Sequence, residues 1–413
     1  MNTNKLSTYY FYIIILLSSY FVDVCLSYKF SENIIKLVTD GQRDQHLLDN
    51  PSFPRLPVKA IYQFGDSLAD TGNLIRADPS NDCAIWPYGE LLSDKPNGRC
   101  SDGLLMIDFF AKFWNIPTID VYLNNEGNFT HGVNFAVAGA TALNTFILEH
   151  KYNIHAQTNL SLSVQLDWFK SHLHSYYVDK SDVRVKLSEG LFFMGEIGGN
   201  DYNFAFFQGN SLSDVYRMVP DVIQAIKSAV EEIIDLGATQ IVVPGNFPIG
   251  CVPIYLSLFK TNDSNMYDEL KCLKEYNKHA QFHNYQLQKT IVKLQKGHPN
   301  VSIVYMDYFG ASIEIVQHAN LFGFDENAIQ VACCGATDNE YKVQMGVYCG
   351  TKGAIVCKNP QEHISWDGVH LTQHAYHVLA KQLMHSFNGG VKNVGVFCFL
   401  TSIIICLILI WGI

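Results

Sequence analysis

Short apolar runs recur along the chain, and each is followed by a polar turn. Four of these runs have the length of a buried strand, and they cover residues 59–64, 191–197, 240–243 and 302–307. Continuous apolar runs of about four to eight residues between turn signals are typical of strands buried on both faces, as in a parallel sheet. The pattern therefore predicts at least four strands of one sheet.

Segments with helical periodicity lie between these runs. In one of them apolar residues repeat every four positions from 222 to 234, and Gly237 follows as a residue typical of a helix end. Further helices are predicted at residues 103–114, 162–177 and 269–295, and a last helix begins near Thr372. Strands that alternate with helices favour one α/β domain, residues 59–390, whose parallel sheet is covered by helices on both faces.

Composition sets the size of the core and limits the partners. Of the 413 residues, 48% are hydrophobic, which is enough for a large core. The formal net charge is −10, and the sequence contains no basic cluster. Because nucleic-acid binding depends on concentrated positive charge, nucleic acid is not expected as a partner.

The two ends of the chain carry apolar segments that differ from the domain. Residues 1–27 have the order of a signal peptide, with Lys5, an apolar run, and then Cys25 and Ser27 as small residues at a cleavage site. The alternative is an uncleaved anchor helix, although the apolar run is short for a membrane span. Residues 28–58 are interpreted as an N-terminal arm. The uncharged residues 394–413 are long enough to span a bilayer and predict either a membrane anchor or a GPI signal.

The cysteines agree with a secretory route. Eight of the 11 cysteines lie between the two terminal segments, and an even number in an oxidising compartment suggests disulfides. Cys83 is expected to pair with Cys100, and Cys251 with Cys272, because each pair brackets a loop. A zinc site is less favoured because the sequence has no CxxC pair.

Glycosylation sequons point to the same route. They begin at Asn128, Asn159, Asn262 and Asn300. Such sequons accept N-glycans in secreted proteins, although they also occur by chance. We expect an extracellular, vacuolar or membrane-attached protein.

One stretch, residues 61–73 (IYQFGDSLADTGN), places a serine directly after the first predicted strand. The apolar run stops at Gly65, and Asp66 and Ser67 follow in a sharp turn. Open α/β sheets bind their ligands at the carboxyl ends of the strands. Ser67 is therefore predicted to be a nucleophile if a neighbouring base can accept its proton. The alternative is that Ser67 only caps a helix.

A candidate base lies near the C-terminal end of the domain. Asp367 and His370 stand three residues apart in the sequence WDGVHLT, at a loop-to-helix junction. This spacing lets the carboxylate hold one imidazole nitrogen while the other faces outward, so His370 is predicted as general base and acid and Asp367 as its orienting group. His374 and His377 share the helical face of His370, but no HExxH order and no nearby carboxylate complete a metal site. No metal is expected, and both residues are predicted to lie at the surface.

Two other turns supply candidate donors for an oxyanion. Residues 132–143 (GVNFAVAGATAL) are small and nearly uncharged, and Gly139 allows a close approach of the backbone to a ligand; the alternative is a tightly packed turn. The second predicted strand ends in a polar turn, residues 198–201, that contains Asn200. The N–H groups of Ser67 and Gly139 and the side chain of Asn200 are the predicted donors. Alternatively, Asn200 is a turn residue that bonds its own backbone.

The stretches FGDSLADTGN, GVNFAVAGATAL, GEIGGNDYNF and WDGVHLT occur in this order and resemble the plant GDSL esterase/lipase family of the SGNH hydrolase superfamily. The resemblance extends from residue 59 to about residue 387. It implies a flavodoxin-like three-layer α/β/α sandwich that needs no cofactor or metal. The marker residues that it implies are Ser67, Gly139, Asn200 and His370, with Asp367 carried over from the Asp-x-x-His pattern.

Two features depart from the common pattern of that family. Leu371 stands where many relatives have proline, and the resulting VHLT form resembles the branch that includes acetylajmalan esterase and sinapine esterase. The hydrophobic C-terminal segment is unusual for the family.

The predicted function is hydrolysis of a small-molecule ester through an acyl-enzyme on Ser67. The resemblance implies an acetyl, methyl or similar ester of a plant specialised metabolite, such as an alkaloid or a phenolic. An acyltransferase with the same intermediate and a lipase for longer acyl esters are the alternatives. A non-catalytic binding protein is disfavoured because all five catalytic positions are intact. We expect a monomer.

Overall fold

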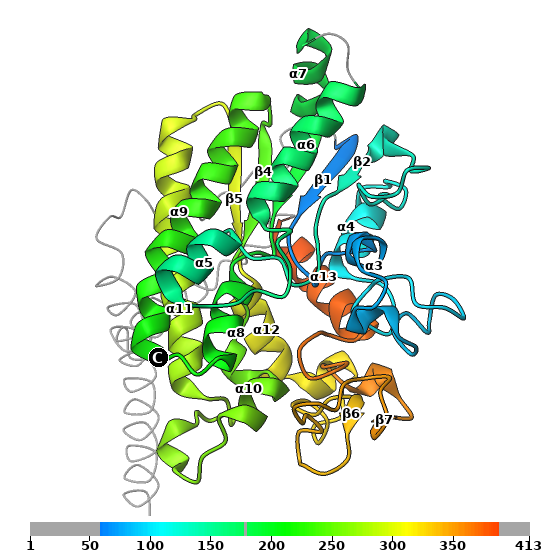
Figure 1. Cartoon of the computed structure of the whole chain (residues 1–413), viewed down its shortest axis with the longest axis vertical. Helices are drawn as coiled ribbons and strands as arrows, with labels where there is room; N and C mark the ends of the chain where they lie inside the picture. Colours follow the sequence, from blue (N-terminus) through cyan, green and yellow to red (C-terminus); the bar gives the residue numbers. More distant parts are fainter. Residues whose placement is uncertain (1–57, 177–179, 388–413) are drawn as a thin grey trace, which may run out of the picture. The chain divides into compact units, whose positions relative to one another are not determined.

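The structure is a computed structural model in which residues 58–176 and 180–387 are described. Its centre is a five-stranded sheet with the order β2-β1-β3-β4-β5, and all neighbouring strands are parallel (Figure 1). The strands are β1 (Ala60–Phe64), β2 (Gly132–Asn134), β3 (Gly190–Met194), β4 (Gln240–Pro244) and β5 (Ser302–Met306). This is a flavodoxin-like strand order, so the predicted α/β class is confirmed.

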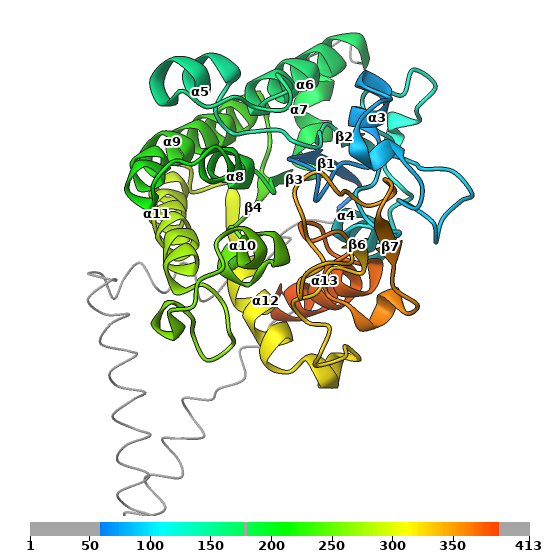
Figure 2. The same cartoon turned by 60° about the horizontal axis from the view of Figure 1, so that its bottom comes forward.

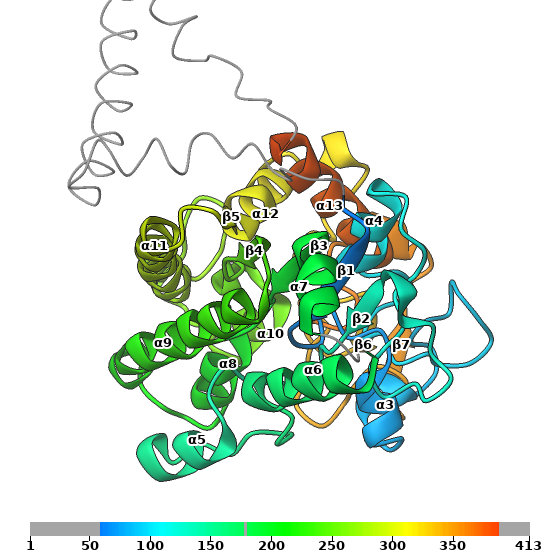
Figure 3. The same ribbon diagram turned by 90° about the horizontal axis from the view of Figure 1, so that it is seen from above.

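Helices cover both faces of this sheet. The helices of the described residues are α3 (Asn73–Ala77), α4 (Met106–Phe113), α5 (Thr145–Tyr152), α6 (Leu162–Tyr176), α7 (Lys180–Ser188), α8 (Gly199–Phe207), α9 (Leu212–Leu236), α10 (Pro253–Leu258), α11 (Lys274–Gly297), α12 (Tyr308–Gln317) and α13 (Gln373–Phe387). Figure 3, a view from above, shows α6 and α9 on one side of the strands and α4, α12 and α13 on the other. The predicted three-layer arrangement is therefore present.

Strand side chains alternate between two apolar cores, because successive residues of a strand point to opposite faces. In β1, Tyr62 and Phe64 pack into the core beneath α6, α8, α9 and α11. Ile61 packs into the second core, beneath α4, α12 and α13. The strands are thus buried on both faces, which explains why they are continuous apolar runs in the sequence.

The helix predicted before Gly237 is α9. Its apolar residues Val222, Ile226 and Val230 are buried, as their four-residue spacing predicts. Ser211 caps its first turn by accepting a hydrogen bond from the N–H of Asp214, and Gly237, with φ 127°, ends it.

Several predicted boundaries were wrong. The strand expected at residues 191–197 ends at Met194, because the chain turns at Gly195, where φ is 135°. The polar turn expected at residues 198–201 is instead the first turn of α8. The small-residue block 132–143 begins as β2, whose three residues pair with β1 at the edge of the sheet. The helix expected at residues 269–295 begins at Lys274, after a loop closed by a bridge between Tyr267 and Leu273.

Among the described residues, four disulfides link segments around the sheet. The predicted bridges Cys83–Cys100 and Cys251–Cys272 are confirmed. Two further bridges were not predicted, and they are Cys333–Cys357 and Cys334–Cys349. These bridges tie together a small antiparallel sheet of β6 (Cys334–Ala336) and β7 (Ala354–Val356), which is drawn in orange in Figure 2.

The predicted signal peptide (residues 1–27), nearly all of the predicted N-terminal arm and the hydrophobic segment 394–413 lie outside the described residues. Within the part of the chain that is described, no helix is both long and apolar enough to cross a membrane.

Candidate active site

The turn after β1 is held by a close approach between two backbones. Gly65 has a φ of 150°, and a Cβ atom at this position would lie only 2.8 Å from the carbonyl oxygen of Glu196. The Asp66 N–H donates to that same carbonyl at 2.8 Å. The Gln165 amide bonds the Gly65 N–H at 2.9 Å and the Gly65 carbonyl at 2.8 Å. Glycine is therefore required here, and Ser67 is presented at the carboxyl end of β1 by a rigid turn.

Two acidic side chains are buried beside this turn. Burial raises the pKa of Asp66 well above its ordinary value, and the nearby charge of Glu196 adds to this effect. Burial also raises the pKa of Glu196, although a hydrogen bond from Tyr308 acts in the opposite direction. These environments favour protonated carboxyl groups. The side chain that contacts the Ser67 hydroxyl as a candidate base comes from another part of the chain.

His370 is in place to be that base. Its Nε2 lies 2.8 Å from the Oγ of Ser67, and its Nδ1 lies 2.6 Å from Oδ2 of Asp367. An ionised carboxylate accepts a hydrogen bond from the Nδ1–H group, and this tautomer leaves Nε2 free of a proton as the acceptor for the serine hydroxyl. The structure thus brings together the three residues predicted from widely separated stretches.

Asp367 remains charged despite its burial. Burial opposes the charged form, but the charge of His370 and the hydrogen bonds to the carboxylate lower the pKa of Asp367 below its ordinary value. The backbone N–H groups of Val369 and His370 donate to Oδ1 at 2.9 and 2.7 Å. An ionised, fully hydrogen-bonded carboxylate can stabilise a positive imidazolium beside it.

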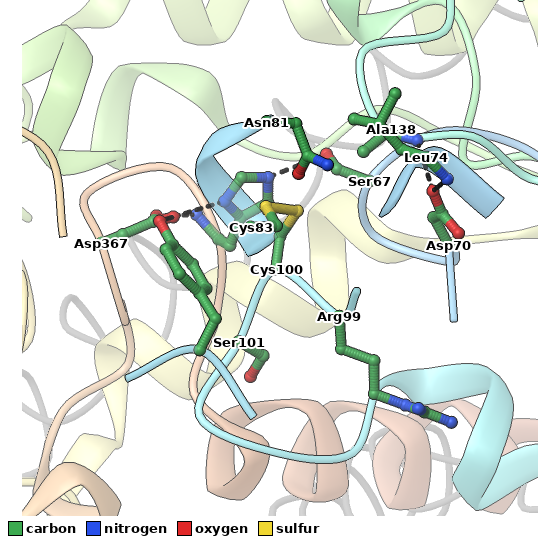
Figure 4. Close-up of a disulfide and its surroundings, with 12 residues drawn as sticks. Ser67, Asp70, Leu74, Asn81, Cys83, Arg99, Cys100, Ser101, Ala138 and Asp367 are labelled. Carbon is green, nitrogen blue, oxygen red and sulfur yellow. Dashed lines mark hydrogen bonds and ion pairs between the residues drawn. A yellow bond between two sulfur atoms is a disulfide. The ribbon is translucent and has the colours of Figure 1, made fainter. Parts of the chain in front are cut away.

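Tyr88 also bonds this carboxylate, and the sequence analysis missed it. Its hydroxyl donates to Oδ2 of Asp367 at 2.7 Å. Burial raises the pKa of Tyr88 well above its ordinary value, and the charge of Asp367 adds to this effect, so the hydroxyl keeps its proton and stays a donor. Tyr88 packs in a small cluster with Trp366 and the Cys83–Cys100 disulfide, whose surroundings Figure 4 shows together with Ser67 and Asp367. No local spacing pattern links a tyrosine to a carboxylate 279 residues away.

The segment that contains Gly139 lies next to the Ser67 turn. The Val137 N–H donates to the Gly65 carbonyl at 3.0 Å, and the Ala138 N–H donates to the Asp70 carboxylate at 2.9 Å. Gly139 itself has a φ of 80°, a backbone conformation that favours glycine. This part of the small-residue block is thus held at the same carboxyl end of the sheet as Ser67.

Asn200 bonds this segment from the first turn of α8. Its Nδ2 donates to the Ala140 carbonyl at 3.0 Å. The neighbouring Asp201 carboxylate accepts the N–H groups of Ala142 and Leu143 at 2.8 and 2.9 Å. The alternative in which Asn200 bonds only its own backbone is therefore not what the structure shows. The Asn200 amide is therefore held against the residue that directly follows Gly139, the other predicted oxyanion donor.

The remaining predicted positions lie apart from this cluster. His377 is exposed, whereas His374 is only partly exposed and has its Nε2 2.9 Å from the carbonyl oxygen of Phe322. Within residues 58–176 and 180–387, no group of three or more His, Cys, Asp or Glu side chains is arranged to hold a metal ion. The four sequon asparagines are exposed, which is compatible with their predicted glycosylation, and they are Asn128, Asn159, Asn262 and Asn300.

Comparisons with known proteins agree with this geometry. The model of the family described as GDSL-like Lipase/Acylhydrolase matches residues 61–383. The chain is 43% identical to GDSL esterase/lipase At1g28570 of Arabidopsis thaliana over 331 residues, which are 79% of this chain and 85% of that protein. It is 41% identical to GDSL esterase/lipase At1g28580 of the same plant over 353 residues, which are 82% of this chain and 90% of that protein. The matched region includes all five predicted catalytic positions.

Proposed function

We propose that this chain, which belongs to the family of GDSL-like lipases and acylhydrolases and is a carboxylic ester hydrolase, works through an acyl-enzyme on Ser67. The observation that carries the proposal is the continuous hydrogen-bonded chain from the Ser67 hydroxyl through His370 to Asp367. A serine hydroxyl becomes nucleophilic when a base of this kind can take its proton.

In the proposed mechanism, Ser67 Oγ attacks the ester carbonyl carbon while His370 Nε2 takes the hydroxyl proton. Asp367 stabilises the imidazolium, and the N–H groups of Ser67, Gly139 and Asn200 bind the oxyanion. Each such donor contributes roughly 3 kcal/mol to the transition state. His370 then protonates the leaving alcohol, and it next activates a water molecule that hydrolyses the acyl-enzyme.

The proposed substrate is an acetyl, methyl or similar ester of a plant specialised metabolite, such as an alkaloid or a phenolic. Support for this class comes from the VHLT form around Leu371, which resembles esterases of specialised metabolism. The curated relatives are named only as GDSL esterases/lipases, and these names support the reaction class.

A substrate screen tests both parts of the proposal. The purified protein and the Ser67→Ala variant are incubated with acetyl, methyl and long-chain esters of phenolic and alkaloid alcohols, and products are read by mass spectrometry. Turnover of short esters that is lost in the variant supports the proposal. Preference for long acyl chains favours a lipase, and transfer to an added acceptor alcohol in place of water favours an acyltransferase. Turnover that survives in Ser67→Ala contradicts the acyl-enzyme.

We also propose that the chain is a glycosylated monomer of the secretory pathway, with residues 1–27 removed and residues 394–413 providing attachment to a membrane. The four disulfides of the described part support an oxidising compartment. A variant that ends near Gly390 should keep its specific activity and move from the membrane fraction to the soluble one. A full-length protein that is already entirely soluble contradicts the membrane attachment.

A further inference from the structure

Asn200 is the last member of a hydrogen-bonded chain that begins at a buried tyrosine. The Tyr255 hydroxyl donates to Oδ1 of Asn203 at 2.7 Å. The Nδ2 of Asn203 donates to Oδ1 of Asn200 at 3.2 Å, and the Nδ2 of Asn200 donates to the Ala140 carbonyl at 3.0 Å. Asn200 and Asn203 are one turn apart on α8, and Tyr255 comes from α10. Two separate helices therefore meet at the oxyanion donor.

The direction of this chain is fixed by its last acceptor. A backbone carbonyl can only accept, so the Asn200 amide must turn its nitrogen towards Ala140 and its oxygen towards Asn203. The nitrogen of Asn203 must then face Asn200, and its oxygen must face Tyr255, which has to donate. Tyr255 is only 2% exposed, and burial raises the pKa of its hydroxyl well above the ordinary value, so the hydroxyl keeps its proton. Every amide in the chain therefore has a single orientation.

An amide nitrogen carries two N–H groups, and Ala140 uses only one of those of Asn200. We propose that Asn203 and Tyr255 are positioning residues that hold the Asn200 amide so that its second N–H is aimed at the oxyanion. The inference rests on the function proposed above, since it assigns Asn200 the same role. A donor that is already oriented costs no reorganisation when the charge develops.

Helix α10, which carries Tyr255, is also hydrogen-bonded to the turn that presents the general base His370. The Ile254 N–H donates to the Gly368 carbonyl at 3.0 Å, within the turn that presents His370. Cys251, two residues before α10, is bonded to Cys272. Helix α10 therefore contacts both the turn of the general base and the chain that ends at the oxyanion donor.

The first test is Tyr255→Phe, which removes the hydroxyl and keeps the ring. The matched control is Tyr276→Phe. Tyr276 packs against Tyr255 with ring centroids 5.3 Å apart, but it does not belong to the hydrogen-bonded chain from Tyr255 to Asn200. Tyr255→Phe should lower kcat by about tenfold with KM within about twofold, because an oriented donor acts mainly on the transition state. Tyr276→Phe should keep the parental kcat. An unchanged kcat in Tyr255→Phe, or a loss that falls on KM alone, overturns the inference.

The second test separates positioning from a general loss of structure. In the Asn200→Ala background, Tyr255→Phe should cause no further loss of kcat, because its effect passes through the absent amide. The same tenfold loss in both backgrounds overturns the inference. Asn203→Asp, which has no N–H to donate, should lower kcat towards that of Asn200→Ala while the protein keeps its melting temperature within a few degrees.

The third measurement does not depend on knowing the natural ester. A fluorophosphonate reacts with an activated serine by forming a phosphorus–oxygen bond to Oγ and releasing fluoride, and its phosphoryl oxygen occupies the oxyanion position. Ser67 in the parent should be labelled about tenfold faster than in Tyr255→Phe. A parent that is not labelled at Ser67 refutes the proposed function and the inference with it. A parent and a Tyr255→Phe variant that are labelled at equal rates refute the inference alone.

Discussion

Acidification should destabilise the fold through two buried histidines on α11. His279 and His283 lie one turn apart and are fully buried. The Nδ1 of His283 is 2.8 Å from the Tyr202 hydroxyl, and the rings of Tyr202 and Tyr216 pack against His279. Burial lowers the pKa of His279 to about 4 and that of His283 to about 3, from an ordinary value of 6.5. Both imidazoles are therefore neutral in the folded protein near neutral pH.

The sign of the effect follows from proton binding. Below pH 6.5 the unfolded chain binds a proton at each histidine while the folded protein does not, so stability falls as the pH falls. At pH 5, which is 1.5 units below the unfolded pKa, each histidine should cost about 2 kcal/mol, and the pair about 4 kcal/mol. The loss for each histidine grows until the pH reaches its folded pKa. Asp201 has the opposite effect on stability. Burial raises its pKa to about 7, so the folded protein binds this proton more tightly than the unfolded chain and gains stability from it as the pH falls.

Because several groups titrate in this range, the assay compares variants. Urea unfolding at pH 7 and pH 5 gives the loss of unfolding free energy for the parent, for His283→Gln and for the control His318→Gln, whose side chain is exposed. His283→Gln should lose about 2 kcal/mol less than the parent between the two pH values, and the control should behave like the parent. If His283→Gln loses as much as the parent, the buried neutral imidazole is not the cause of acid lability.

Three further predictions concern the site and its supports. Asn200→Ala should lower kcat by roughly 100- to 1,000-fold with little change in KM, and a full-rate but destabilised variant in steady-state kinetics and melts rejects the oxyanion role. Tyr88→Phe removes a hydrogen bond to the charged Asp367 and should lower the unfolding free energy by about 1.5–3 kcal/mol, measured by urea unfolding; parental stability argues against that bond. Replacing Cys251 and Cys272 by serine should cost about 3 kcal/mol for a bridge that spans 21 residues, and an unchanged unfolding midpoint contradicts this contribution.

Much of the fold follows from local patterns. Strands β1, β3, β4 and β5 are continuous apolar runs because both of their faces are buried, so their positions were predicted and only their ends shifted. Strand β2 was missed because it has three residues, Gly132–Asn134, too few for a periodic signal. The pairing of Cys333 and Cys334 was likewise beyond local reasoning, since adjacent cysteines can exchange partners without changing any spacing.

In the candidate site, too, local sequence patterns predicted some residues and not others. Ser67, Asp367 and His370 carry short-range signals, namely a strand followed by a turn and the Asp-x-x-His spacing, and the structure brings these residues into contact. Tyr88 and Tyr255 act at long range through single hydrogen bonds. A single tyrosine in a loop or a short helix has no pattern that distinguishes it from a packing residue, so only three-dimensional contacts identify it.

The measurement that tests the central claim most directly is the mass of the enzyme during turnover. The parent protein is mixed with an ester that it hydrolyses, quenched in acid and digested, and the peptides are read by mass spectrometry. We predict an added acyl mass on the peptide that contains Ser67, and no such mass, together with a loss of turnover, in a folded Ser67→Ala variant. An acyl group on a different residue, or Ser67→Ala activity within about tenfold of the parent, contradicts the assignment of Ser67 as the nucleophile.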